Sequence, residues 1–146
     1  MSLQIIQPSE EVLNVSVPLF AETVRAGFPS PAAGYEEAEL NLHEYCVAHP
    51  SATFFVRASG SSMIEGGISD NDLLVVDRSL TPKDGDIVVA SIDNEFTIKK
   101  LKLKGSRPCL MPMNPQYTPI YFDPDTFQIW GVVTYIIKEA NHVRAC

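Results

Sequence analysis

The sequence predicts a mostly β domain with one short helix and an extended N-terminal arm. Three observations carry this prediction: β-rich runs recur from residue 52 onward, a capped helical segment precedes them, and prolines interrupt residues 1–35. With 146 residues, 45% of them hydrophobic and 20% charged, the chain can form one compact domain with its own core. We therefore divide it into an arm over residues 1–35 and a β-rich domain over residues 36–146.

The arm contains short apolar groups that show no sustained helical period. The prolines between them are Pro8, Pro18, Pro29 and Pro31. Proline fixes its own backbone and removes a hydrogen-bond donor, so regular structure cannot continue through these positions. The arm is therefore predicted to be extended, with isolated strand contacts.

The predicted helix lies in NLHEYCVAHP, residues 41–50. Asn41 followed by Glu44 is a variant of the capping box that begins many helices. The apolar and aromatic side chains of the segment fall on one helical face. Pro50 is expected to end the helix.

Six runs, separated by Gly, Pro, Asp and Asn, predict the strands of the domain. They are TFFVR, LLVVD, DIVVASI, EFTIKKLKL, PIYF and FQIWGVVTYIIK. Asp93 and Asn94 join the third run to the fourth, and both residue types tolerate positive φ, which predicts a tight hairpin turn. Gly131 inside the last run predicts a bulge or sharp bend.

Charge and composition argue against several classes of protein. The net charge of -7 repels phosphate backbones, so direct nucleic-acid binding is not expected. The cysteines and histidines lack the spacing of a disulfide scaffold or a metal site, and we expect neither a metal nor another cofactor. No apolar run reaches the ~18 residues of a membrane span, and no signal peptide is apparent. We expect a cytoplasmic protein that does not contact membranes.

The segment ASGSSMIEGG, residues 58–67, follows the first predicted strand and places two adjacent hydroxyls between glycines. A serine hydroxyl is a weak nucleophile at its ordinary pKa and needs a base to activate it. No histidine triad is in view. The candidate bases are therefore the lysines of EFTIKKLKL.

Side chains alternate between the two faces of a strand, so the adjacent lysines of this run lie on opposite faces. Lys99 shares its face with Leu101 and Leu103. Lys100 shares the other face with Ile98, so alternation does not decide which lysine is buried. Desolvation lowers the pKa of a buried lysine from its ordinary ~10.4, which allows the neutral amine to act as a base for serine. On these residues alone, a polar turn and a solvated strand edge are the alternatives.

Several motifs occur together and in order along the chain: FPSPAA, HPSAT, SGSSMIEGGI, GDIV and EFTIKKL. In these motifs the chain, from about residue 18 to residue 137, resembles the UmuD-like SOS mutagenesis proteins of the LexA-like serine/lysine autopeptidase family. The resemblance implies a LexA/signal-peptidase-like fold of coiled β-sheets. It also implies a self-cleaving serine endopeptidase.

The resemblance assigns roles to particular residues. Ser62 is the expected nucleophile, and Lys99, the first lysine of the pair, is the expected general base and later acid. The backbone N–H groups of Ser62 and Ser61 are the expected oxyanion donors. The family cuts its own arm, and the matching bond is Ala26–Gly27 in VRAGFPSPAA. Well-known members carry cysteine at the position of Ala26 and aspartate at that of Ser61. Neither difference touches the expected pair, but the second serine, Ser61, leaves open which of the two hydroxyls attacks.

The resemblance also implies partners. They are a second copy of the chain in a homodimer, a RecA filament on single-stranded DNA that stimulates cleavage, and a UmuC-like Y-family DNA polymerase that carries out error-prone translesion synthesis in the SOS response.

Three alternatives share the fold. A LexA-type transcriptional repressor needs a DNA-reading domain before the cleavage bond, for which 26 residues are too few. A non-catalytic interaction module would not need both Ser62 and Lys99. A signal-peptidase relative would be expected to carry a membrane anchor.

Overall fold

The computed structural model describes residues 3–6, 15–20, 37–105, 107–121, 123 and 125–140. The chain divides into two compact units, one of Met1–Glu10 with His49–Cys146 and the other of Glu11–Ala48. Each unit is described by itself. The boundary predicted between arm and domain stays a prediction, and the predicted cleavage bond Ala26–Gly27 lies outside the described residues.

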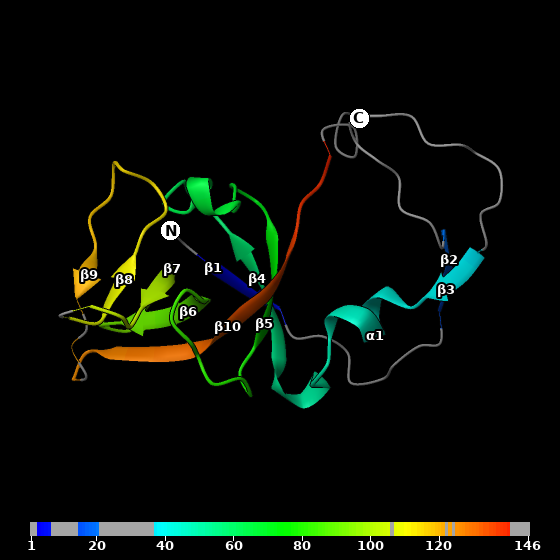
Figure 1. The fold of residues 1–146 in the computed structure, drawn as a ribbon, viewed down its shortest axis with the longest axis horizontal. Coiled ribbons are helices and arrows are strands. Elements are labelled where there is room, and N and C mark those ends of the chain that lie inside the picture. The colour runs from blue at the N-terminus through cyan, green and yellow to red at the C-terminus, as the bar shows by residue number, and fades with distance from the viewer. Residues whose placement is uncertain are drawn as a thin grey trace. The chain divides into compact units, whose positions relative to one another are not determined.

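The smaller unit contains a two-stranded antiparallel sheet of β2 (Val17–Phe20) and β3 (Glu37–Leu40), followed by the helix α1 (Leu42–Cys46) (Figure 1). The side chain of Asn41 accepts a hydrogen bond from the Glu44 N–H at 3.1 Å, as the capping motif predicts. The helix ends at Cys46, so the prediction that Pro50 ends it is wrong; Pro50 instead begins a separate 3-10 segment, Pro50–Ala52.

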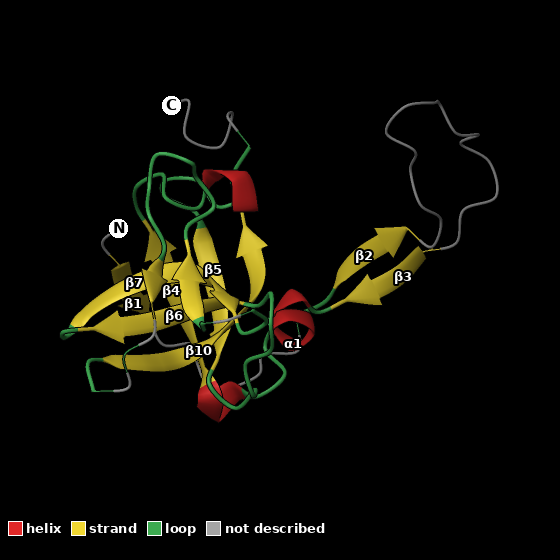
Figure 2. Ribbon diagram, turned by 60° about the vertical axis from the view of Figure 1, so that its left-hand side comes forward, coloured by secondary structure: helices red, strands yellow, loops and turns green. Residues whose placement is uncertain are grey.

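The larger unit is built on one antiparallel sheet with the strand order β1-β4-β5-β10-β6-β7-β8-β9 among the described residues. Its strands are β1 (Leu3–Ile6), β4 (Thr53–Ala58), β5 (Leu73–Asp77), β6 (Ile87–Ile92), β7 (Glu95–Lys102), β8 (Cys109–Met111), β9 (Ile120–Tyr121) and β10 (Phe127–Ile137). Figure 2 shows these strands curving round one another rather than forming a flat layer. The mostly β fold is therefore the one predicted.

Two predicted irregularities position the strands around the site. The β6–β7 hairpin turns at Asp93 and Asn94, whose φ angles are 50° and 66°, as predicted for these residue types. The register of β10 against β6 shifts between Ile129 and Gly131, which confirms the predicted bulge. A Cβ on Gly131 would lie 2.7 Å from Cγ1 of Val76, so only glycine allows β10 to pass this close to β5.

Among the described residues of the larger unit, the buried apolar side chains form two clusters. One cluster contains Val56 of β4, Val76 of β5 and Ile98 of β7, together with Met63 from the turn after β4. The other contains Leu101 of β7 with residues of β6, β8 and β10. Because Met63 is fully buried, the turn that carries the candidate serines is anchored in the core.

Candidate active site

The serine turn, residues 59–67, leaves the end of β4 and presents the candidate nucleophile. Gly60 has a φ of 91°, a left-handed conformation that favours glycine, and its N–H donates to Asp70 Oδ1 at 2.9 Å. The turn closes with a short 3-10 segment, Ile64–Gly66. Ser62 is only 3% exposed, which is unusual for a serine in a polar turn.

Lys99 of β7 meets Ser62 in the folded chain. Its Nζ lies 3.1 Å from Ser62 Oγ, and the lysine side chain is 6% exposed. Burial lowers the pKa of the Lys99 amine below its ordinary value of 10.5. Among the described residues Lys99 forms no ion pair that would favour its charged form.

Two further acceptors surround the Lys99 amine. Nζ donates to Thr97 Oγ1 at 2.9 Å and to the Ile98 carbonyl oxygen at 3.0 Å. Thr97 is not among the residues that the sequence singles out for chemistry. Strand alternation places Thr97 on the same face as Lys99, two residues before it, but assigns it no role.

The two alternatives left open by the sequence differ clearly in the structure. Lys100 lies on the opposite face of β7 from Lys99 and is half-buried, pairing across the strands with Ile87. Ser61 is exposed, and its hydroxyl lies 3.4 Å from the Tyr117 hydroxyl rather than against a lysine. The structure thus brings together Ser62 and Lys99, and not Ser61 or Lys100.

The chain resembles known proteins over most of its length. The model of the Peptidase S24-like family matches residues 18–134. The chain belongs to this family. Protein MucA of Salmonella typhimurium is 57% identical over 141 residues, which cover 95% of this chain and 96% of MucA. Protein SamA of the same species is 51% identical over 139 residues, covering 95% and 97% of the two chains.

A third relative, protein ImpA of Salmonella typhimurium, is 50% identical over 129 residues, or 87% of each chain. These matches confirm the resemblance of this S24-like chain to the UmuD-like SOS mutagenesis proteins. At the level of the family it is a serine peptidase. The roles of individual residues stay predictions.

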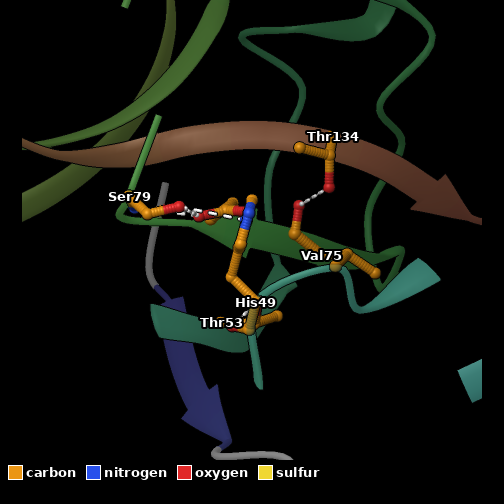
Figure 3. Close-up of polar contacts among 6 residues, drawn as sticks. His49, Thr53, Val75, Ser79 and Thr134 are labelled. Atoms are coloured by element: carbon orange, nitrogen blue, oxygen red, sulfur yellow. Dashed lines mark hydrogen bonds and ion pairs between the residues drawn. The ribbon is translucent and has the colours of Figure 1, made fainter. Parts of the chain in front are cut away.

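A second polar cluster of this S24-like chain also contains a serine and a base. The histidine cluster consists of His49, Asp77 and Ser79, and Figure 3 shows the His49 and Ser79 side chains converging (Figure 3). Asp77, which is 4% exposed, accepts from the Ser79 hydroxyl at 2.6 Å and lies 2.6 Å from His49 Nδ1. Burial acts to raise the pKa of Asp77, but hydrogen bonds from His49 and Ser79 outweigh it and hold this pKa below its ordinary value.

The histidine cluster does not have the arrangement of a catalytic triad. In a triad the carboxylate and the serine contact opposite nitrogens of the imidazole. Here Asp77 Oδ2 and Ser79 Oγ both contact His49 Nδ1, at 2.6 and 3.1 Å. The Thr53 hydroxyl also donates to the His49 carbonyl at 2.7 Å, which ties this segment to β4 (Figure 3). The cluster therefore has a structural role: it links His49, just before β4, to the end of β5.

Within the described part of the chain, no group of three or more His, Cys, Asp or Glu side chains could hold a metal ion. None of the helices described there is long and apolar enough to span a membrane.

Proposed function

We propose that this S24-like protein cuts its own Ala26–Gly27 bond, with Ser62 as nucleophile and Lys99 as general base and acid. The observation that carries the proposal is the buried Lys99 amine, 3.1 Å from Ser62 Oγ and without an ion pair among the described residues. A lysine in this setting loses its proton more easily than one in water.

The three oxygens around Lys99 suit a neutral amine. Such an amine has two N–H donors and one lone pair. The Ile98 carbonyl can only accept, and Thr97 Oγ1 is placed to accept as well, which takes up both donors. The lone pair is then left for the Ser62 hydroxyl proton. The pocket thus favours the orientation in which Ser62 is activated.

The reaction follows from this arrangement. Ser62 Oγ attacks the carbonyl carbon of Ala26 while its proton moves to Lys99 Nζ. The tetrahedral intermediate collapses as Lys99 returns the proton to the Gly27 nitrogen, and the Ala26–Gly27 C–N bond breaks. Water, deprotonated by Lys99, then releases Ala26 from the serine ester and restores both side chains.

The oxyanion donors are the backbone N–H groups of Ser61 and Ser62. Neither N–H has an acceptor among the residues that the structure describes. Donors that are held in place before the reaction stabilise the developing negative charge without reorganising.

The attachment of the substrate to the enzyme suits a single self-cleavage. A tethered bond reacts at a high effective concentration, so a modest catalyst is sufficient. Ala26 and Gly27 are small, and Pro29 and Pro31 favour an extended chain that a cleft can bind.

The wider role is part of the same proposal. A RecA filament on single-stranded DNA stimulates cleavage, and the shortened chain, as a homodimer in the cytoplasm, serves a UmuC-like Y-family DNA polymerase during translesion synthesis. The UmuD-like relatives support this role. The net charge of -7 fits partners that are proteins rather than DNA.

The test is self-cleavage without RecA between about pH 6 and pH 10, with the fragments identified by mass spectrometry. Because the neutral amine is the active form, the rate should rise with pH, with a midpoint below 10.5. Lys99→Ala should lower the rate at least about 10³-fold. Lys100→Ala, which changes the neighbouring lysine on the other face, should cut normally. Normal cleavage by Lys99→Ala would disprove the assignment of the base, and a wild-type chain inert at every pH would indicate a non-catalytic module.

A further inference from the structure

The geometry points to Asn114 as a positioning residue that orients the peptide between Ser61 and Ser62, and with it the N–H that receives the oxyanion. This inference rests on the proposed self-cleavage. Asn114 follows β8 in the chain and is far from the serine turn in sequence, but its side-chain Nδ2 donates to the Ser61 carbonyl at 2.9 Å.

The two ends of the Asn114 amide are distinguished by their partners. Its Oδ1 accepts from the Gln116 N–H at 3.0 Å, so the opposite end, the NH₂ group, faces the Ser61 carbonyl. A flipped amide would place NH₂ against N–H and oxygen against oxygen, and both contacts would be lost. The donor to Ser61 is therefore fixed by the turn that follows Asn114.

Fixing the Ser61 carbonyl also fixes the direction of the Ser62 N–H. The two groups belong to one planar trans peptide and point in opposite directions. The Ser61 carbonyl accepts from the Ile64 N–H at 3.2 Å as well as from Asn114, so the peptide is held by two donors on one side. The Ser62 N–H on the other side has no acceptor among the described residues.

The Asn114 bond also makes the Ser62 N–H a better donor. A hydrogen bond to the carbonyl of an amide polarises the whole peptide group and strengthens its N–H. An oxyanion bound there gains both from the fixed direction of the donor and from this polarisation. Asn114 thus acts on the transition state through the Ser61–Ser62 peptide without touching the substrate.

Main-chain contacts keep the serine turn in place independently of the Asn114 side chain. The Met113 N–H donates to the Ser62 carbonyl at 2.8 Å, and the Glu65 N–H donates to the Met113 carbonyl at 2.7 Å. A change of the Asn114 side chain leaves these bonds intact. Its effect on cleavage can therefore be separated from an effect on folding.

The experiment compares two variants over the same pH range as the wild-type chain. Asn114→Asp keeps an acceptor for the Gln116 N–H but loses the donor to Ser61. Asn114→Ala is uncharged and loses both. Asn94→Asp makes the same chemical change in the exposed β6–β7 turn and is the matched control. The readouts are the plateau rate at high pH, the midpoint of the pH profile and the thermal unfolding temperature.

We expect both Asn114 variants to lower the plateau rate by about 10-fold or more, whereas Asn94→Asp cuts normally. For Asn114→Ala the pH midpoint should not move, because Lys99 keeps its surroundings, and the unfolding temperature should stay within about 3 °C. Wild-type plateau rates in both variants would overturn the inference. So would a rate loss in Asn114→Ala that comes with a shifted midpoint, because that result would mean a distorted Ser62–Lys99 pair.

Failure of the proposed function has a different signature. In that case Lys99→Ala would cleave like the wild-type chain, or the wild-type chain would not cleave at all. Either result would overturn the self-cleavage mechanism and the role of Asn114 with it. Normal cleavage by the Asn114 variants beside inert Lys99→Ala would overturn only the role of Asn114.

Discussion

The Ser62–Lys99 pair and the histidine cluster can be compared directly, because each brings a serine hydroxyl to a nitrogen base. The distance from Ser62 Oγ to Lys99 Nζ and the distance from Ser79 Oγ to His49 Nδ1 are both 3.1 Å. The distance from hydroxyl to base therefore does not distinguish the two sites. They differ in what else the base and the hydroxyl contact.

In the histidine cluster one carboxylate forms hydrogen bonds with both the base and the serine hydroxyl. Asp77 accepts a hydrogen bond from the Ser79 hydroxyl at 2.6 Å and faces His49 Nδ1 at 2.6 Å, so the nitrogen that donates to the carboxylate has no lone pair left for Ser79. At the Ser62–Lys99 pair the other neighbours of the amine are acceptors, and the lone pair is left for the serine. A base activates a serine only when its lone pair faces the hydroxyl.

The largest expected difference between the sites is in cleavage. Ser62→Ala should lower the self-cleavage rate at alkaline pH by at least about 10³-fold, because the attacking oxygen is lost. Ser79→Ala should stay within about threefold of the wild-type rate, because the Ser79 hydroxyl donates its hydrogen bond to Asp77 and not to a base that could activate it. Mass spectrometry of the fragments measures both. A loss of activity in a folded Ser79→Ala chain would contradict the comparison.

The second prediction concerns the stability of the histidine cluster. Asp77→Ala should lower the free energy of unfolding by about 2–4 kcal/mol, because the hydrogen bonds that His49 and Ser79 make to the charged carboxylate are lost. Urea denaturation measures the change. Ser62→Ala serves as the control and should change the free energy of unfolding by less than about 1 kcal/mol. Equal changes in the two variants would mean that the cluster is not a structural tie.

The third prediction is that a substitution at the Ser62–Lys99 pair stabilises the folded chain. Lys99→Met should raise the free energy of unfolding at pH 7 by about 1 kcal/mol, because burial disfavours the charged amine in the folded chain. The lowered pKa of Lys99 means that the unfolded chain binds its proton more tightly, so the gain should disappear above about pH 10.5. Urea denaturation at both pH values tests this. Lys100→Met on the other face should give no comparable gain.

The smallest expected effect is on the stability of the folded chain at acidic pH. The pKa of Asp77 is lowered in the folded chain from 3.8, so the unfolded chain takes up this proton first. The stability that the carboxylate contributes is full above about pH 4 and is lost as the pH falls through the lower, folded-state pKa. Asp77→Asn should therefore lose less stability than the wild-type chain between pH 5 and about pH 2. Parallel losses in the two chains would show that the cluster does not carry this pH dependence.

Much of the fold could be predicted because its signals are local. The strand runs, the Asn41 cap, the Asp93–Asn94 turn and the bulge at Gly131 each depend on a few neighbouring residues. Two strands are not predicted, because their sequences carry no such local signal. β3 (Glu37–Leu40) is a charged tetrapeptide, and β8 (Cys109–Met111) is too short to show a period of two.

The site could be predicted only in part. Alternation placed Lys99 with Leu101 but could not exclude Lys100, because both faces of β7 carry apolar side chains. The serine turn covers one face and decides which lysine is buried, and this contact spans 37 residues of chain. The hydrogen bond from Asn114 to Ser61 spans 53 residues, and no local sequence pattern predicts it.

The three oxygens around Lys99 Nζ can accept hydrogen bonds from the amine in either protonation state, although burial favours the neutral one. An ammonium ion can direct its three hydrogens at Ser62, Thr97 and the Ile98 carbonyl, all within 3.1 Å. The inactive form, with a protonated Lys99, and the active form, with a neutral Lys99, can therefore share one set of coordinates and differ by a single proton. If the N-terminal arm binds and excludes water from these oxygens, the pKa of the Lys99 amine falls further. The serine would then be activated without movement of either side chain.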